Sequence, residues 1–495
     1  MLKINLNRFF YVALLGLFSY IGNLYAELSS SQNSEILKMT TLKMIKLTDD
    51  QLLSEQKALE SDLSEITRLN NEHTKSSEAR LSDLMEGYPL QFKSELAQIY
   101  SENDYLLLWE NKKVNKAFLK EYAVFVASGI SKNAGKKLKE IDKLSNIGGL
   151  IYDILLSDAF LDYMYYSKHV KDFAQDWLYE SNRYISSSPS KSDILSWLNA
   201  IKSHNELAFI DSLSTKNSIY LDTLNKLIEL SSAKVIENTS QLNKLALNLQ
   251  RLRVIPEFRN GIFVNIPSYQ LNYYRDGKLL LNSRVIVGKV ARKTPVMYSR
   301  LSNVVVNPPW TPTEKLINED IVPKIKKDPS YVDSHNYTIK DSSGKIIDPY
   351  SINWTEIKGK FPYRIRQAAG GSALGNYKFN MPSSDAIYLH DTPNHSLFSK
   401  KKRALSSGCV RVEKSDELAT ILLKESGWTE SRKNSVLKSR KTSSANINSN
   451  NPVYLYYVTY WVDNGKINIA PDIYSYDNVV SKINTDWKLL QKYLN

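Results

Sequence analysis

The sequence is poor in the residues that build disulfides and metal sites. Its 495 residues contain one cysteine, Cys409, so no internal disulfide can form and the fold must rest on packing. The hydrophobic content of 42% is enough for substantial cores. The six histidines lack the spacing of metal ligands, and no glycine-rich phosphate loop or dinucleotide fingerprint is present. We therefore expect no metal and no cofactor.

Acidic residues are outnumbered by basic ones, and the net charge is +13. A basic protein suits an anionic partner, such as cell-wall peptides, lipid headgroups or nucleic acid. The basic residues do not form a stripe interleaved with aromatics, and no nucleic-acid module is visible, so we expect no nucleic-acid binding. The alternative is that the charge is spread over the surface and only keeps the protein soluble.

The first 26 residues are predicted to be an export signal. Lys3 and Arg8 form a basic start, residues 9–21 are apolar, and Ala26 ends a small-residue cleavage site. The uncharged run 9–26 reaches the lower limit of a membrane span, so an uncleaved anchor with membrane association is the alternative. We expect an exported protein, in which an unpaired cysteine must be either buried or used.

The first half of the chain is predicted to be helical. Residues 27–85 form a polar and partly helical N-terminal segment. Residues 86–253 show apolar positions at helical spacing, for example Ile151, Leu155 and Ala159, and short serine-rich breakers separate the helices. This pattern predicts an all-α scaffold domain, because such stripes are usually core rather than binding surface.

After residue 253 the apolar period changes from helical to alternating. Residues 262–267, 269–274 and 279–287 are predicted strands, and Asp276-Gly277 is the hairpin turn between the last two. Residues 254–480 are thus a mainly-β domain within an α+β multidomain chain. Residues 430–451, rich in Ser, Asn and Lys, are predicted to be a flexible insertion, and residues 481–495 a C-terminal helix.

The lone cysteine lies in a motif suited to nucleophilic chemistry. Cys409 follows Ser406-Ser407-Gly408, and His390 ends a short predicted strand, residues 385–390. A nucleophilic thiol needs a base, because its ordinary pKa of about 8.5 leaves it protonated at neutral pH. It also needs backbone donors for the oxyanion that forms when it attacks a carbonyl. The alternative is a small buried side chain without chemistry.

The full string resembles the active-site signature of the L,D-transpeptidases, cysteine enzymes that cross-link peptidoglycan. It runs from His390-Asp391 through a spacer to Ser-Gly-Cys-Val-Arg. Ser407 stands where the usual motif has histidine, as in a large periplasmic subgroup. The resemblance implies a periplasmic enzyme with a β-sandwich catalytic domain and a capping subdomain at residues 311–372. The separate wall-binding module of that subgroup is missing, since only residues 231–245 fill its place.

The resemblance also implies roles for the motif residues. Cys409 would attack the stem-peptide carbonyl, His390 would act as base, and the backbone amides of Ser407, Gly408 and Cys409 would hold the oxyanion. Three polar residues are the predicted substrate contacts: Arg411, Asp391 and Ser406. For Arg411 the alternative is a strand residue that points to solvent.

The implied activity is direct linkage of diamino acids in adjacent peptidoglycan stems through a cysteinyl thioester, with release of D-alanine. The implied partners are stem peptides and carbapenem inhibitors. Two alternatives stay open: the same acyl-enzyme used for L,D-carboxypeptidase or protein-anchoring chemistry, and a non-catalytic wall-binding scaffold.

Overall fold

The computed structural model describes residues 64–65, 68, 72, 74–180, 184–233, 238–384, 386–448, 451–478 and 485–495. The predicted export signal lies outside these residues, as does most of segment 27–85. The chain divides into two units, one of Met1–Glu86 with Lys93–Asn103 and one of Gly87–Phe92 with Asp104–Asn495. Among the described helices, none combines the length and the apolar character that crossing a membrane requires.

The predicted scaffold is helical. Helix α4 (Lys93–Glu102) belongs to the first unit. The second unit contains α5 (Lys112–Ser128), α6 (Ala134–Leu144), α7 (Gly149–His169), α8 (Ala174–Tyr179), α9 (Lys191–Lys202), α10 (Glu206–Leu213), α11 (Ser218–Ser231) and α12 (Thr239–Arg253). Helix α7 is buried on all sides, which is why apolar residues are not confined to one face of it. Phe160 of α7 packs edge-on against Phe118 of α5, with ring centroids 5.2 Å apart.

The mainly-β domain is one curled sheet of eleven strands. They are β1 (Gly261–Asn265), β2 (Gln270–Arg275), β3 (Lys278–Gly288), β4 (Met297–Arg300), β5 (Asn303–Val306), β9 (Tyr377–Asn380), β10 (Leu389–His390), β11 (Ala404–Ser406), β12 (Val410–Val412), β13 (Ser443–Asn446) and β14 (Pro452–Tyr456). The order is β13-β5-β9-β10-β12-β3-β2-β1-β14-β4, with β11 beside β3.

Strand β3 is the long member that joins the two halves of the sheet. It pairs with β2 along its first part and with β12 and β11 along its second. The predicted hairpin turn before it is confirmed, because Asp276 and Gly277 both have positive φ, 49° and 77°. Two positive φ values are what a tight two-residue hairpin needs, and glycine adopts one of them without strain.

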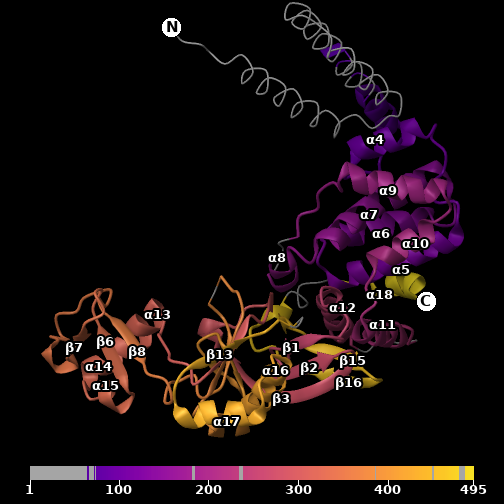
Figure 1. Cartoon of the computed structure of the whole chain (residues 1–495). Helices are drawn as coiled ribbons and strands as arrows, with labels where there is room; N and C mark the ends of the chain where they lie inside the picture. Colours follow the sequence, from indigo (N-terminus) through magenta and orange to yellow (C-terminus); the bar gives the residue numbers. More distant parts are fainter. Residues whose placement is uncertain are drawn as a thin grey trace, which may run out of the picture. The chain divides into compact units, whose positions relative to one another are not determined.

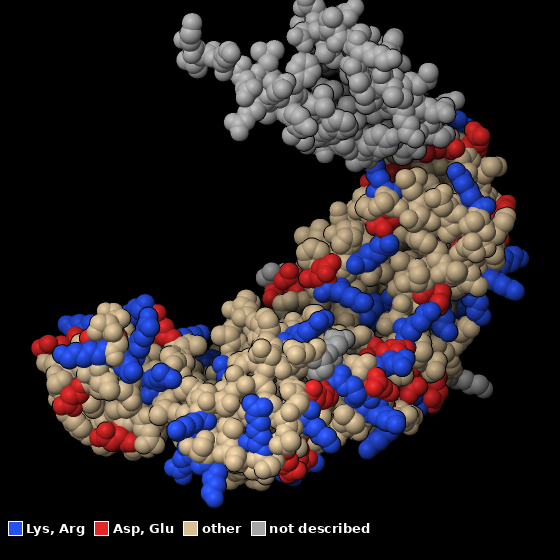
Figure 2. Space-filling model, in the orientation of Figure 1, with Lys and Arg blue, Asp and Glu red and all other residues tan. Residues whose placement is uncertain are grey.

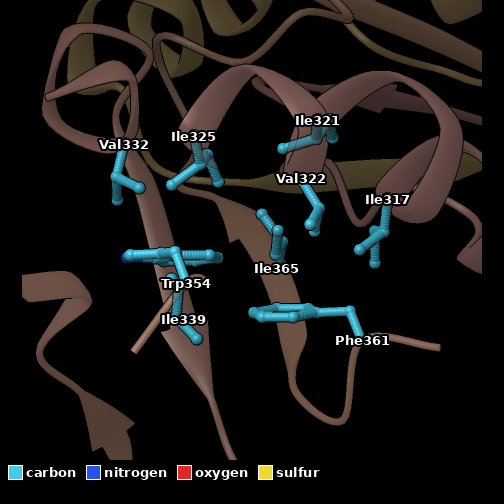
Figure 3. Packing of buried hydrophobic residues seen from close by; sticks show 9 residues of the cluster. All are labelled: Ile317, Ile321, Val322, Ile325, Val332, Ile339, Trp354, Phe361 and Ile365. Atoms are coloured by element: carbon cyan, nitrogen blue, oxygen red, sulfur yellow. The ribbon is translucent and has the colours of Figure 1, made fainter. Parts of the chain in front are cut away.

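The predicted capping insertion has its own hydrophobic core (Figure 3). It consists of α13 (Glu314–Leu316), a π-helical turn (Ile317–Ile321), α14 (Val322–Lys327), α15 (Tyr331–Ser334), β6 (Tyr337–Lys340), β7 (Ile346–Ile347), a 3-10 turn (Pro349–Ser351) and β8 (Arg364–Gln367). Two backbone hydrogen bonds between Trp310 and Gln367, 2.8 and 3.1 Å long, close its neck. The insertion therefore leaves and re-enters the catalytic domain at one place.

The prediction of a flexible segment at 430–451 is wrong for its described part. Residues Glu430–Ser439 form helix α17, and β13 pairs with β5 in the sheet. Polar contacts anchor the segment: Lys433 is buried and its Nζ contacts Asp416 at 2.8 Å, and Asn307, which follows β5, donates its Nδ2 to Val436 O at 2.8 Å. Composition alone cannot distinguish such anchored polar groups from solvated ones.

The end of the chain returns to the helical region. The hairpin of β15 (Tyr460–Asp463) and β16 (Lys466–Ile469) contacts α11, and α18 (Trp487–Leu494) packs against α5. Between scaffold and sheet lies Arg251 of α12, which is fully buried and pairs with Asp477 at 2.5 Å. The scaffold and the catalytic domain are thus joined by packing and a buried ion pair.

Candidate active site

The sheet places Cys409 and His390 on neighbouring strands. Strand β10 pairs in parallel with β12, with Leu389 opposite Val410 and His390 opposite Arg411. Because side chains alternate between the faces of a sheet, His390, Arg411 and Cys409 share one face. Lys378 joins them, since it pairs with His390 from β9 on the other side. The predicted strand 385–390 is shorter than expected, and only Leu389–His390 is regular.

His390 is buried and held by its own loop. Its Nδ1 lies 2.5 Å from the backbone carbonyl of Asp391. A carbonyl only accepts, so Nδ1 carries the proton and Nε2 is left as an acceptor. Burial lowers the pKa of His390 to about 3, and the positive charges of Arg411 and Lys378 add to this effect. The imidazole is therefore neutral at physiological pH and able to take a proton.

Cys409 is half-buried beside Tyr388. Its Sγ donates to the carbonyl of Ala386 at 3.8 Å. Burial raises the pKa of the thiol, against the lowering effect of hydrogen bonds from the backbone amide and the phenol of Tyr388 and of the charges of Lys378 and Arg411. The resting pair is thus a neutral thiol and a neutral imidazole rather than an ion pair.

The turn before Cys409 departs from the predicted oxyanion site. The N–H of Gly408 donates to Ser406 Oγ at 3.1 Å, so this amide is already used and its predicted oxyanion role is wrong. The amides of Ser407 and Cys409 have no acceptor among the described residues. Gly408 itself is required, because its φ is 124° and an added Cβ would lie 3.2 Å from Ile387 Cδ1.

Two predicted substrate contacts are structural instead. Ser406 is buried, and its Oγ donates to Cys409 O at 2.6 Å. Asp391 is also buried, and its carboxylate accepts from Asn376 N and from Ser415 Oγ, each at 2.8 Å. Ser415 is the first residue of helix α16 (Ser415–Glu425). These side chains position the loops around the thiol.

Arg411 has the environment expected of a ligand-binding side chain. It is half-buried on the face of His390 and Cys409, so the solvent-pointing alternative does not hold. Its Nε is buried without a hydrogen-bond partner in the described structure. Burial lowers the pKa of Arg411. A buried guanidinium edge without an acceptor is suited to an incoming carboxylate.

Sequence reasoning missed Tyr388, Lys378 and Trp310. The indole N–H of Trp310 hydrogen-bonds to the Tyr388 hydroxyl, and Lys378 Nζ lies 4.1 Å from the centre of the Tyr388 ring. Trp310 also packs against the core of the capping insertion. The alternation of β10 could have identified Tyr388, since it lies two residues before His390 and so on the same face.

A second link joins the insertion to the loop that carries the thiol. Arg292 forms ion pairs with Asp320 and, at 2.6 Å, with Glu319 of the π-helical turn. Its other contact is Ser407 Oγ, to which Nη1 donates at 3.1 Å. The same guanidinium therefore touches the capping insertion and the residue two positions before Cys409.

Comparison with known proteins decides the family. Residues 259–471 match the family described as YkuD, the L,D-transpeptidase catalytic domain, and residues 94–227 match a family described as the Scaffold domain. A Haemophilus influenzae protein named "Putative L,D-transpeptidase" is 54% identical over 443 residues, which cover 89% of this chain and 90% of the relative. The chain belongs to the L,D-transpeptidase family. The predicted family and the predicted order of helical scaffold and mainly-β catalytic domain are confirmed.

Two solved structures are also similar to this L,D-transpeptidase family member. One is the NMR structure of the catalytic domain from E. faecium L,D-transpeptidase acylated by ertapenem, at 14% identity and a TM-score of 0.19, covering 40% of this chain and 97% of that one. The other is the Ldtfm-avibactam carbamoyl enzyme, at 13% identity and a TM-score of 0.20, covering 55% and 90%. The family assignment rests on the sequence matches.

Proposed function

We propose that this protein links adjacent peptidoglycan stem peptides directly through their diamino acids, by way of a thioester on Cys409. The observation that carries the proposal is the shared face of β10 and β12. It brings together a half-buried thiol, a neutral imidazole and an arginine, and neither the Nε2 of the imidazole nor the Nε of the arginine has a hydrogen-bond partner among the described residues. Export to the periplasm is part of the proposal.

Acylation begins with attack of Cys409 Sγ on the carbonyl carbon that precedes the terminal D-alanine. His390 Nε2 takes the thiol proton as the C–S bond forms. The amides of Ser407 and Cys409 receive the oxyanion, at about 3 to 4 kcal/mol per donor in comparable sites. The C–N bond then breaks, and His390 returns the proton to the amine of D-alanine, which leaves.

Deacylation repeats these steps with a new nucleophile. The side-chain amine of a diamino acid on a second stem attacks the thioester, His390 takes its proton, and the C–S bond breaks. The proton then returns to the thiolate and restores the neutral pair. Water in place of the amine would give L,D-carboxypeptidase activity, so the acceptor decides between the two outcomes.

In this proposal the two cations of the site, Arg411 and Lys378, bind the carboxylates of the substrate. A stem peptide carries free carboxylates, and Arg411 offers a bidentate guanidinium edge on the same face as the thiol. Lys378 lies on the other side of His390. Both charges also favour the thiolate that forms transiently when the C–S bond breaks.

The test is intact-mass measurement and product analysis. The purified protein incubated with disaccharide-tetrapeptide should release D-alanine and form cross-linked dimers, and a carbapenem should add one adduct per chain, since Cys409 is the only thiol. Cys409→Ala should abolish both. Lys400→Ala, in the exposed loop between base and nucleophile, is a matched control that should keep both.

Two results would contradict the proposal. Release of D-alanine without dimers would mean that water is the acceptor. An unchanged mass with carbapenem, under conditions where iodoacetamide labels Cys409, would mean an accessible thiol without an assembled acyl-transfer site.

A further inference from the structure

A second concave site lies away from Cys409, between the β15–β16 hairpin and the outer face of β2 and β3. Figure 1 shows this hairpin beside the two strands. Its volume is about 350 Å³, within the range of small-ligand pockets. A polar outer face is ordinary for an antiparallel sheet that faces water. Here the hairpin covers that face and makes a cavity of it, so solvation alone does not explain its lining.

Side-chain amides line one side of the cavity. Gln270 and Asn272 alternate along β2, and Asn282 faces them from β3, with Asn282 Nδ2 donating to Asn272 Oδ1 at 2.6 Å. This contact leaves the NH₂ group of Asn272 and the carbonyl oxygen of Asn282 without partners in the described chain. The side-chain amides therefore offer both hydrogen-bond donors and hydrogen-bond acceptors to a ligand. Hydroxyl and acetamido groups can pair with both kinds.

Aromatic rings lie beside the amides, since Tyr274 follows Asn272 on the same face of β2. Phe258 contacts both Tyr274 and Tyr456, with ring centroids 5.9 and 6.1 Å apart, and Trp461 of the hairpin joins them. The two tyrosine hydroxyls and the indole N–H of Trp461 have no hydrogen-bond partner among the described residues. Such rings present an apolar face for C–H groups and a polar edge for hydroxyls.

The charge of the lining residues limits the kinds of ligand that the cavity can bind. No Lys or Arg is among the described residues that line the cavity, although the chain has 65 of them, and Asp463 is its carboxylate. An anionic stem peptide or phosphate would meet Asp463 without a compensating cation. A neutral ring with hydroxyl and acetamido groups matches the amides, the aromatic faces and the single acceptor carboxylate.

We propose that this cavity binds a neutral N-acetylated saccharide of the glycan strand. The inference rests on the proposed function, because a stem peptide processed at Cys409 is attached to such a strand. Strand β3 connects the two sites: Asn282 lines the cavity, and Ile286 of the same strand pairs with Arg411. Four residue steps along the strand separate Asn282 from Ile286, a distance of about 13 Å. The saccharide site supplies the wall attachment for which the sequence predicts no separate module.

The first test is calorimetric titration of the full chain with chitotetraose, an uncharged N-acetylglucosamine tetramer. Trp461→Ala should weaken binding at least ~5-fold, because the saccharide loses the aromatic face on which its C–H groups stack. Asn282→Ala, at an exposed position where folding is not at risk, should weaken it roughly 5-fold through one lost hydrogen bond. Tyr298→Ala removes an exposed aromatic of β4 outside the cavity and should leave binding unchanged.

The second test separates this inference from the proposed function. Cys409→Ala should still bind chitotetraose while forming no acyl-enzyme. Asn282→Ala should raise KM for disaccharide-tetrapeptide but not for free tetrapeptide, with kcat unchanged. Normal acylation with no chitotetraose binding at millimolar concentration overturns the saccharide site and leaves the proposed function standing. Binding of chitotetraose that Trp461→Ala and Asn282→Ala do not weaken also overturns it.

Discussion

The lowered pKa of His390 predicts how the free energy of unfolding depends on pH. Its pKa is held at about 3 in the folded protein, against about 6.5 in an unfolded chain. Between these values the unfolded state binds a proton that the folded state does not. The stabilisation from keeping the imidazole neutral is therefore complete above pH 6.5 and lost as the pH falls towards 3.

The magnitude follows from the size of the shift. At 1.36 kcal/mol per pKa unit, the loss reaches about 3 kcal/mol at pH 4.5 and about 4 kcal/mol at pH 3. His390→Gln keeps a similar volume and removes the titrating group. The free energy of unfolding of the wild type should therefore fall relative to that of His390→Gln by about 3 kcal/mol between pH 7.5 and pH 4.5.

The assay is urea unfolding at a series of pH values for both proteins, and only their difference matters because they share every carboxylate. His204→Gln, at an exposed histidine, is the control for removing an imidazole that is not buried. ¹³C-histidine NMR gives an independent reading, in which one resonance missing from His390→Gln should not titrate above pH 4.5. Parallel stability curves for wild type and His390→Gln, or titration of that resonance near pH 6.5, would refute the reasoning.

Three further variants test the surroundings of the site and the joint to the scaffold. Trp310→Phe removes the hydrogen bond to Tyr388 and should slow carbapenem acylation roughly 5-fold, measured by stopped-flow, while unchanged rates would assign Trp310 to packing alone. Arg292→Ala breaks ion pairs to partly exposed carboxylates, so it should lower the free energy of unfolding by less than about 1 kcal/mol. It should nevertheless increase amide hydrogen exchange across Ile317–Ile321. The control Arg284→Ala, which breaks an ion pair to Glu413, should not increase that exchange. Arg251→Met should lower the free energy of unfolding by about 3 kcal/mol, because Asp477 loses a fully buried partner; a neutral result by urea unfolding would show that Lys244, 2.9 Å from Asp477, compensates.

Local patterns predicted the parts of the fold that local chemistry determines. The turn at Asp276 and Gly277 follows from glycine's tolerance of positive φ, and the strands beside it follow from alternation. The pairing of β10 with β12 could not be predicted in this way. It joins residues far apart in the chain and has only two residue pairs, so its stability comes from neighbours that the strand's own sequence does not specify.

Within the site, the sequence predicted which residues lie near the thiol better than it predicted the role of each residue. Cys409 and His390 were identified from the motif, and the sheet places them on one face. The side chains of Ser406 and Asp391 look equally suited to substrate, yet burial turns both inward to hold loops. Whether a polar group is buried depends on the packing of elements that are distant in sequence. A linear motif does not contain that information.

The return of α18 to the helical region shows the same limit at the scale of domains. Its sequence indicates an amphipathic helix but not the surface on which it lies. That surface is α5, and Tyr493 OH donates to Asp142 of α6 at 2.6 Å. The N- and C-terminal parts of the second unit thus share one core, which no boundary drawn along the sequence could indicate.

The paired backbone of Trp310 and Gln367 has a consequence for how this enzyme family can diversify. Because Trp310 and Gln367 hold the two ends together, the residues between them form one closed loop on the catalytic sheet. Each doubling of the length of such a loop costs only about 0.6 kcal/mol in closure entropy. Because the inserted residues fold around their own core, they can be lengthened, shortened or exchanged without changing the register of β5, β9 and β10. Evolution can therefore change the insertion while His390 stays beside Arg411 in the sheet.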